Sequence, residues 1–596
     1  MGVHDGQSEG RGLNFFAADR DLQSLLEAGL GADYDRAKPL LSRMGELSGD
    51  AIDRQAEYTD RLARPVLETY DRQGNVVNHV RYNPLYEESR RQVYGLGVVG
   101  CNYGPDPLPY LAHFGLLYLL SQSDPGLACP VTLTACTAYV LARHGSQGQK
   151  ERYLPRLAVR APGPFADGAT FVTEKQGGSD AGLATTDAVA LAGEALAAAR
   201  AAYGDGDEQL ARLTGEKWFA SNADADLALV TARPPGEQDG TKGLGLYLMP
   251  REMRDGRPNT YRIRRLKDKL GTTGLATGEI ELEGALAELV TPPPHGFTHM
   301  LEALEFSRIA NAAASAGIHR RAYLEAMLYA QSRRAFGAPL AEHAMVQETI
   351  VTMLAELRAS MALAFEAAVA LDLAQGDRGP EATAWHRLTT AVAKYRTGEA
   401  AVRNASRAIE VLGGNGYVEE YVTARMYREA QVLPVWEGPA NIQALELLRT
   451  LSPRWAADRL LARRVLSVSA AALDDPRTRA LGELLRRRWD EAERAIAWLK
   501  AHAEEQSAHA RRLLDFLGAI LELTLCLEWA LRELAGGDER GLVLAHWLAR
   551  IDLAPAAARG VGEDLSWLGA VYPRLTGGEP ISGVRLRSLA EEVRLG

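Results

Sequence analysis

The sequence predicts an α+β protein with a helical first part, a β domain in the middle and two helical parts after it. Three observations support this prediction. Apolar residues recur every three or four positions up to about residue 160, short alternating runs follow up to about residue 290, and long alanine-rich amphipathic patterns fill the rest. At 596 residues the chain also exceeds the size of one hydrophobic core. We therefore expect domains at residues 1–164, 165–295, 296–450 and 451–596.

The first helical part begins at a capping signal. Asp19 precedes Arg20-Asp-Leu-Gln-Ser-Leu-Leu-Glu, in which the leucines fall on one helix face. The β domain is indicated by alternating runs that Gly, Asp and Pro residues separate, namely Leu227–Ala232, Leu244–Met249 and Glu279–Glu283. A helical insertion is expected at Ala188–Ala202, where it loops out of the β domain.

Prolines mark the boundary to the later helices. Thr291-Pro-Pro-Pro-His-Gly closes the β region, and long amphipathic patterns return from about residue 297 to 450. Their alanine-rich faces allow helices to pack closely, as in a bundle. From about residue 452 onward, further segments rich in Leu, Ala and Arg predict an additional helical domain.

Composition and charge restrict the class of protein. The hydrophobic content of 46% and the charged content of 24% are typical of soluble globular proteins. A net charge of −10 and a pI near 5.8 argue against general affinity for nucleic acid. The four cysteines form no CxxC pair, and no Cys/His spacing resembles a zinc site. We therefore expect reduced thiols and no metal site.

The N-terminus and the apolar runs predict a cytoplasmic protein. Asp5, Glu9 and Asp19 interrupt the N-terminal stretch, which has no signal-peptide core. Tyr110–Leu120 is apolar but shorter than the roughly 18 residues of a membrane span, and no other run is expected to reach that length. We therefore expect no membrane span.

One glycine pattern imitates a dinucleotide site. Gly95-Leu-Gly-Val-Val-Gly100 has the letters of GxGxxG, but such a site requires a preceding strand and a following helix. Cys101-Asn-Tyr-Gly-Pro-Asp-Pro follows instead and cannot open a helix at once. The pattern predicts a loop without a nucleotide.

An acid beside a glycine turn is a candidate catalytic base. Val435-Trp-Glu-Gly438 follows the glycine loop Leu412-Gly-Gly-Asn-Gly-Tyr417 by about twenty residues. A carboxylate in a largely water-free pocket, next to an electron acceptor, is suited to removing a proton from carbon. Taken alone the segment is weak evidence, because an isolated Glu is usually solvated.

Two further segments allow a functional and a structural interpretation. Phe171-Val-Thr-Glu-Lys-Gln-Gly-Gly-Ser-Asp180 carries hydroxyls and glycines that either bind a flavin and its pyrophosphate or cap a hairpin connection. Arg333-Arg-Ala-Phe-Gly337 either ends a helix with charge that complements its dipole or sends an arginine to a phosphate.

In their order along the chain, these motifs resemble the acyl-CoA dehydrogenase superfamily over roughly residues 90–450. The set also includes His144–Leu157 and Lys217-Trp-Phe-Ala-Ser221. The extra helical domain and three segments resemble the AidB-like subgroup, namely Glu174-Lys-Gln-Gly-Gly, Leu266-Lys-Asp-Lys-Leu-Gly-Thr and Ala276-Thr-Gly-Glu. The resemblance implies an N-terminal helical domain, a central antiparallel β-barrel or sandwich, a four-helix bundle and the extra helical domain.

The resemblance also implies a non-covalent FAD between the β domain and the second helical domain. By position, Thr173 contacts the flavin ring, Ser179 the pyrophosphate, Trp218 one ring face and Ser221 the reactive edge. The other implied FAD-binding residues are Phe171, Gly178, Arg333, Phe336, Gly413, Gly414, Asn415, Trp436, Gly438 and Asn441. Arg333, Phe336 and the glycine loop match segments that reach the FAD of a neighbouring subunit, which implies a homotetramer built as a dimer of dimers.

Glu437 matches the catalytic base of the family. The resemblance implies that Glu437 removes the α-proton of an acyl-CoA while the β-hydride passes to flavin N5. Arg308 matches an arginine that tunes this base, or it is an ordinary solvated helix arginine. Pro439 and Ala220 depart from the family, because hydroxyl residues that assist the flavin often occupy both positions.

Three functions compete at this point. The first is an FAD-dependent acyl-CoA dehydrogenase that passes electrons to an electron-transfer flavoprotein. The second is an AidB-like flavoprotein that binds DNA through its C-terminal domain in the alkylation response, and the third is an acyl-chain-binding sensor. Arg486, Arg487 and Arg488 are the candidate nucleic-acid contacts, but consecutive residues fan around a helix, and residues 451–596 hold 21 basic and 21 acidic side chains. We favour the dehydrogenase.

Overall fold

The computed structural model describes residues 9–203, 208–376, 379–554 and 566–582, which divide into two units. The sheet unit comprises residues 50–109 and 123–310. The helical unit comprises residues 1–49, 110–122 and 311–596. Helix α9 (Gly296–Ser332) begins in the sheet unit and ends in the helical unit.

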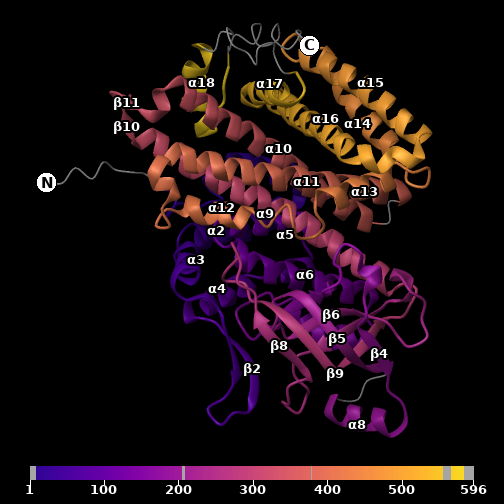
Figure 1. The fold of residues 1–596 in the computed structure, drawn as a ribbon. Helices are drawn as coiled ribbons and strands as arrows, with labels where there is room; N and C mark the ends of the chain where they lie inside the picture. Colours follow the sequence, from indigo (N-terminus) through magenta and orange to yellow (C-terminus); the bar gives the residue numbers. More distant parts are fainter. Residues whose placement is uncertain (1–8, 204–207, 377–378, 555–565, 583–596) are drawn as a thin grey trace, which may run out of the picture. The chain divides into compact units, whose positions relative to one another are not determined.

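A seven-stranded sheet organises the sheet unit (Figure 1). The strand order is β3-β6-β7-β9-β5-β4, and β8 pairs with β9 as well. The strands predicted from the alternating runs are confirmed as β6, β7 and β9. The predicted antiparallel pairing holds for the named strands except β3 and β6, which pair in parallel. The strands are β3 (Gly168–Phe171), β4 (Asp187–Ala190), β5 (Leu210–Ser221), β6 (Leu227–Ala232), β7 (Gly245–Pro250), β8 (Tyr261–Leu266) and β9 (Thr277–Thr291).

Two segments of the sheet unit differ from the sequence prediction. The predicted helical first part contains an antiparallel hairpin, β1 (Val66–Tyr70) and β2 (Val76–Arg81). Its turn is closed by Asp71, whose carboxylate accepts hydrogen bonds from the backbone N–H groups of Gln73 and Asn75. The predicted helical insertion begins as strand β4, because this segment pairs with β5, and α8 covers only Gly193–Tyr203.

The sheet unit also contains four further helices outside its strands, namely α3 (Ala51–Leu62), α4 (Pro84–Gly95), α6 (Pro125–His144) and α7 (Gln147–Leu157). The GxGxxG pattern starts at the last residue of α4 and turns through Gly97 at φ 85°, so the loop prediction is confirmed. By length and composition α6 is apolar enough to cross a membrane, which the sequence prediction missed. Since α6 is mostly buried and packs on β3, it is a core helix.

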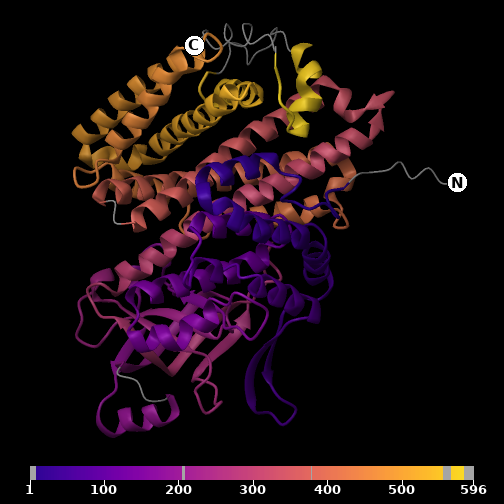
Figure 2. The same cartoon turned by 180° about the vertical axis from the view of Figure 1, so that it is seen from behind.

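The helical unit holds most of the remaining helices. Figures 1 and 2 show α14, α15 and α16 side by side in the additional C-terminal part, where each packs on the other two. The helices are α1 (Arg20–Leu30), α2 (Tyr34–Gly49), α5 (Tyr110–Ser121), α10 (Ala344–Gln375), α11 (Gly379–Leu412), α12 (Val422–Ala430), α13 (Ala440–Thr450), α14 (Ala457–Leu473), α15 (Arg479–Ala501), α16 (Gln506–Ala535), α17 (Arg540–Asp552) and α18 (Ser566–Gly577).

Buried arginines join this additional part to α1 and α10. Arg358 on α10 hydrogen-bonds Asp21 at 2.9 Å and Glu533 at 3.0 Å, and its guanidinium lies 3.7 Å from the centre of the Trp529 ring. Arg540 on α17 binds the same Asp21 carboxylate at 2.7 Å. Paired arginines of this kind neutralise carboxylates that burial would otherwise destabilise. Buried ion pairs therefore link the additional helices to α1 and α10.

Two buried histidines predict a loss of stability on acidification. The Nε2 atoms of His319 and His546 lie 3.1 and 3.3 Å from backbone carbonyls, and neither Nδ1 has a partner among the described residues. Burial lowers the pKa of His319 to about 3 and that of His546 to about 4. Unfolded histidines titrate near 6.5, so below that pH the unfolded chain binds more protons and stability falls.

We expect urea denaturation to show this fall between pH 6.5 and pH 4, with each histidine contributing up to about 1.4 kcal/mol per pH unit. A His319→Gln variant should show a shallower pH dependence, because its amide has no comparable proton to bind. The exposed His79→Gln is the matched control. An equal slope in His319→Gln and the wild type would contradict this assignment.

Candidate functional site

In the sheet unit, the predicted flavin segment forms a tight turn after β3. Glu174 and Gly177 exchange backbone hydrogen bonds of 3.2 and 3.1 Å, which closes the turn. The Trp218 backbone N–H donates to the Thr173 carbonyl at 2.9 Å, so the turn lies against β5. A Cβ on Gly178 would stand 3.0 Å from the Thr173 Oγ1, which explains a glycine there. Phe171 is buried in the sheet core, and Ser179 is exposed.

A buried ion pair lies on the inner side of this turn. The Lys217 Nζ donates to Glu174 Oε1 at 2.8 Å and to the Thr231 carbonyl at 2.9 Å, and the two side chains are 0% and 1% exposed. Thr185 and Thr186 add four donors to the same carboxylate. Burial alone raises the pKa of Glu174, but Lys217 and the hydroxyl donors lower it to about 2. The pair therefore ties the turn to β5 and β6 in its ionised form.

Lysines cover the Trp218 side chain, which points away from Lys217 on the same strand. The Lys267 Nζ lies 3.6 Å and the Lys175 Nζ 5.6 Å from the centre of the indole ring. Lys267 belongs to the Leu266–Thr272 motif, so this contact gives a physical role to a segment that the sequence marked only by resemblance. Ser221 is partly buried with its Oγ 3.3 Å from Thr277 Oγ1, and Ala220 is buried.

In the helical unit, a small hairpin follows α9. β10 (Arg334–Ala335) and β11 (Ala338–Pro339) are joined by Phe336 and Gly337, which have φ values of 52° and 87°. The Phe336 side chain at the tip is 97% exposed. The helix ends at Ser332, directly before the predicted segment, and the segment itself forms a hairpin.

The glycine loop lies beside the end of α9. Residues Gly413–Tyr417 form a short 3₁₀ helix, and the Asn415 side-chain amide donates to Tyr329 Oη at 3.4 Å. The backbone carbonyl of Tyr329 accepts the backbone N–H of Arg333 at 2.8 Å. Tyr329 thus links two of the predicted FAD contacts, Arg333 after α9 and Asn415 in the glycine loop.

Glu437 lies on an unusual turn between Trp436 and the start of α13. Its backbone has φ 57°, a left-handed conformation that non-glycine residues rarely adopt, and Gly438 follows at φ 94°. Pro439 is the N-cap residue of α13, which places Asn441 in the first helical turn. Gln443, which sequence reasoning missed, is 0% exposed and donates its side-chain N–H groups to the Glu437 carbonyl at 3.1 Å and the Gly438 carbonyl at 2.9 Å.

The predicted auxiliary arginines are placed as follows. Arg308 lies on α9 in the sheet unit and is only 9% exposed, so it is not a solvated helix arginine. Arg486 lies 3.6 Å from Asp490, and Arg488 binds Glu491 at 2.9 Å and the Leu553 carbonyl at 2.8 Å. Two of the three consecutive arginines are therefore paired with carboxylates on α15.

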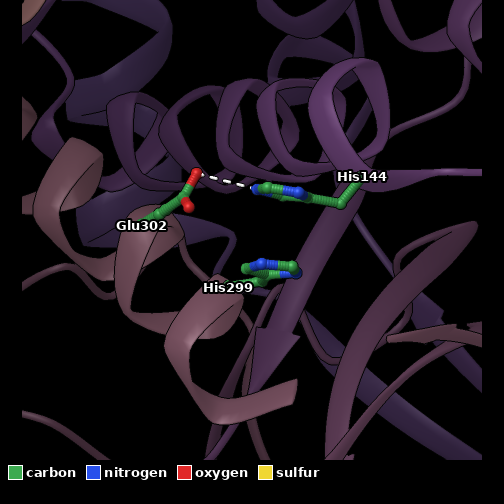
Figure 3. A group of neighbouring side chains, drawn as sticks. All are labelled: His144, His299 and Glu302. Carbon is green, nitrogen blue, oxygen red and sulfur yellow. Dashed lines mark hydrogen bonds and ion pairs between the residues drawn. The ribbon is translucent and has the colours of Figure 1, made fainter. Parts of the chain in front are cut away.

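A histidine–carboxylate group in the sheet unit escaped the sequence search. His144 from α6, together with His299 and Glu302 from α9, places ligand atoms within 4.8 Å of one another (Figure 3). The two imidazole rings are stacked 3.5 Å apart at 8°, so their nitrogen lone pairs do not converge on one point. Arg143 Nε and His144 Nε2 already hold one Glu302 oxygen at 3.0 and 2.9 Å. This geometry favours a hydrogen-bonded stack over metal coordination. Burial is the main cause that lowers the pKa of His299, and the neighbouring His144 lowers it further.

Taken together, the helical and sheet units define the architecture of an acyl-CoA dehydrogenase. Residues 294–452 match "Acyl-CoA dehydrogenase, C-terminal domain" and residues 169–285 match "Acyl-CoA dehydrogenase, middle domain". Residues 7–161 match "Adaptive response protein AidB N-terminal domain".

Individual relatives agree with these matches. Acyl-CoA dehydrogenase family member 11 of Caenorhabditis elegans is 32% identical over 73% of this chain and 69% of its own. AidB of Escherichia coli K12 is 30% identical over 81% of this chain and 86% of its own. The crystal structure of Caenorhabditis elegans ACDH-11 in complex with C11-CoA superposes with a TM-score of 0.81 at 26% identity, over 100% of this chain and 96% of that one. The chain belongs to the acyl-CoA dehydrogenase superfamily and, within it, to the AidB-like subgroup.

Proposed function

We propose that this protein is an FAD-dependent acyl-CoA dehydrogenase in which Glu437 removes the α-proton of an acyl thioester. The observation that carries the proposal is the left-handed backbone of Glu437, held by Gln443 at the start of α13. Strained non-glycine residues persist only where their surroundings fix them, and they concentrate at active sites. Membership of the superfamily supplies the class of reaction and the acyl-CoA substrate.

Several polar groups of the chain fit an FAD. The buried Trp436 indole N–H has no hydrogen-bond partner among the described residues, so an acceptor on a bound ligand would satisfy it. Thr173 and Ser179 would hold the flavin edge and the pyrophosphate in the sheet unit, and Trp218 and Ser221 would lie near the ring. When bound, FAD accepts the hydride from the β-carbon.

The chain's own residues supply the proton chemistry. The Glu437 carboxylate takes the α-proton, and the Glu437 backbone N–H hydrogen-bonds the thioester carbonyl and stabilises its developing charge. Because Ala220 and Pro439 lack the hydroxyls that often occupy their positions, the hydride step has fewer flavin contacts than in many relatives. Arg308 is the proposed tuning residue for the base.

We further propose a cytoplasmic homotetramer that passes its electrons to an electron-transfer flavoprotein. The side chains of Phe336 and Tyr417 are 97% and 84% exposed, which a second copy of the chain would cover. Arg333 and the glycine loop would then contact the FAD of the neighbouring subunit. The domain ranges 1–164, 165–295, 296–450 and 451–596 are part of the same proposal.

Anaerobic mixing of the purified flavoprotein with acyl-CoAs of varied chain length and branching tests the function. We expect at least one of them to bleach the flavin absorbance, and Glu437→Gln to bind the same acyl-CoA without bleaching. Binding of acyl-CoAs without bleaching by the wild type would favour the acyl-chain sensor. Bleaching at the wild-type rate by Glu437→Gln would remove Glu437 from the base role.

DNA binding through the C-terminal helices is the second candidate function, and the match of residues 7–161 to the AidB N-terminal domain favours it. The ion pairs of Arg486 and Arg488 oppose it, because arginines that already bind carboxylates release fewer counterions from DNA. Salt-dependent duplex binding that is lost in Arg486→Ala/Arg487→Ala/Arg488→Ala would support this candidate.

A further inference from the structure

The turn that carries Glu437 needs an external restraint. Glu437 and Gly438 adopt consecutive positive φ values of 57° and 94°, and only the second residue is a glycine. A glutamate is disfavoured in the left-handed region, because its Cβ crowds the neighbouring carbonyl. Without a restraint, the peptide would relax toward a negative φ and swing the carboxylate with it.

Gln443 supplies this restraint with one side-chain amide. Its Nε2 donates to the Glu437 carbonyl at 3.1 Å and to the Gly438 carbonyl at 2.9 Å, so both donors of one NH₂ group are used on adjacent peptides. The backbone N–H of Gln443 also donates to the Pro439 carbonyl at 3.2 Å, which fixes the side chain at the first turn of α13. We call the pair of hydrogen bonds from Nε2 the Gln443 clamp. A Cβ at position 438 would stand 2.9 Å from the same Nε2, so the clamp requires the absence of a side chain at Gly438.

We propose that Gln443 is the positioning residue for Glu437: it locks the left-handed turn and thereby aims the carboxylate at the α-carbon of the substrate. The inference rests on the proposed dehydrogenase function. The Gln443 side-chain amide donates to the backbone carbonyls of Glu437 and Gly438, so it acts on the turn that carries the base. Its loss should therefore slow proton abstraction more than it weakens substrate binding, because a shift of about 1 Å in a catalytic group costs roughly 100-fold in rate.

Two variants of Gln443 test the proposal. Gln443→Met keeps the length and removes both donors, and Gln443→Glu keeps the shape and offers only acceptors when ionised. For both we expect kcat to fall about 100-fold with little change in KM. Hydrogen exchange in the purified protein should accelerate at the backbone amides of residues 437, 438 and 440–443.

Gln149→Met is the matched control. Gln149 is also 0% exposed and donates its side-chain amide to a backbone carbonyl, that of Leu289 at 3.3 Å, but on α7. We expect Gln149→Met to lose thermal stability with kcat unchanged. Gln443 variants that behave like this control, with wild-type kcat and unchanged exchange at residues 437–443, would overturn the positioning role.

The exchange measurement separates the two proposals. If no acyl-CoA reduces the flavin of the wild-type protein, the dehydrogenase function fails. Faster exchange at residues 437–443 in the Gln443 variants would then still support the clamp on Glu437, and unchanged exchange would overturn it. If Gln443→Met does not fold, Gln443→Glu provides the same readouts.

Discussion

Replacing Glu437 by glycine is expected to abolish acyl-CoA oxidation and at the same time to stabilise the fold. The loss of a general base lowers the rate by about 10²–10⁴-fold. The gain in stability comes from the backbone, because Glu437 has φ 57° and a left-handed non-glycine residue costs about 1–2 kcal/mol. Glycine also makes the unfolded chain more flexible, which lowers the free energy of unfolding by roughly 0.4–1 kcal/mol. The net increase in the free energy of unfolding is therefore roughly 0.5–1 kcal/mol.

Glu437→Gln separates the two effects. It keeps the strained backbone and nearly the same shape, so it should lose activity as Glu437→Gly does without the gain in the free energy of unfolding. Urea denaturation of both variants and of the wild type measures the difference. A Glu437→Gly protein less stable than Glu437→Gln would show that the left-handed turn stores no strain, and that its conformation has another cause.

The sequence predicts the strands well where one strand carries its own alternation. Leu227–Ala232 and the run at Glu279 became β6 and part of β9, because period-two patterns are local. The parallel pairing of β3 with β6 depends on two segments distant in sequence, so no local pattern encodes it. The β1–β2 hairpin was missed because it is short and flanked by strong helical periodicity on both sides.

In the candidate site, too, local motifs could be predicted and contacts of the folded chain could not. The position of Glu437 beside a glycine turn follows from its motif, but its left-handed conformation and the Gln443 clamp are properties of the folded turn. Gln443 could have been found only by asking which side chain reaches back from the first turn of α13. The group of His144, His299 and Glu302 joins residues about 155 positions apart, and metal-spacing rules do not search over such distances.

Breaking the buried Glu174–Lys217 pair is expected to be the most destabilising single change among these predictions. Lys217→Met removes the ammonium and leaves a carboxylate that is 1% exposed, a loss for which about 3–5 kcal/mol of unfolding free energy is typical. The Thr185 and Thr186 donors remain, so we expect the lower end of this range. Since the turn of Thr173 rests on this pair, FAD affinity should fall with stability.

The double variant Glu174→Gln/Lys217→Met decides whether charge or shape is responsible. It removes both charges together, so it should recover most of the stability that Lys217→Met loses, because no uncompensated ion stays buried.

The pH dependence of the stability provides a second test. Lys217 and the hydroxyl donors lower the pKa of Glu174 to about 2 against the opposing effect of burial, so Glu174 stabilises the wild type above its unfolded pKa near 4.3 and loses this contribution as the pH falls toward 2. Lys217→Met should weaken that acid dependence, and a variant with wild-type stability from pH 7 to pH 4 would show that the pair contributes little to the fold.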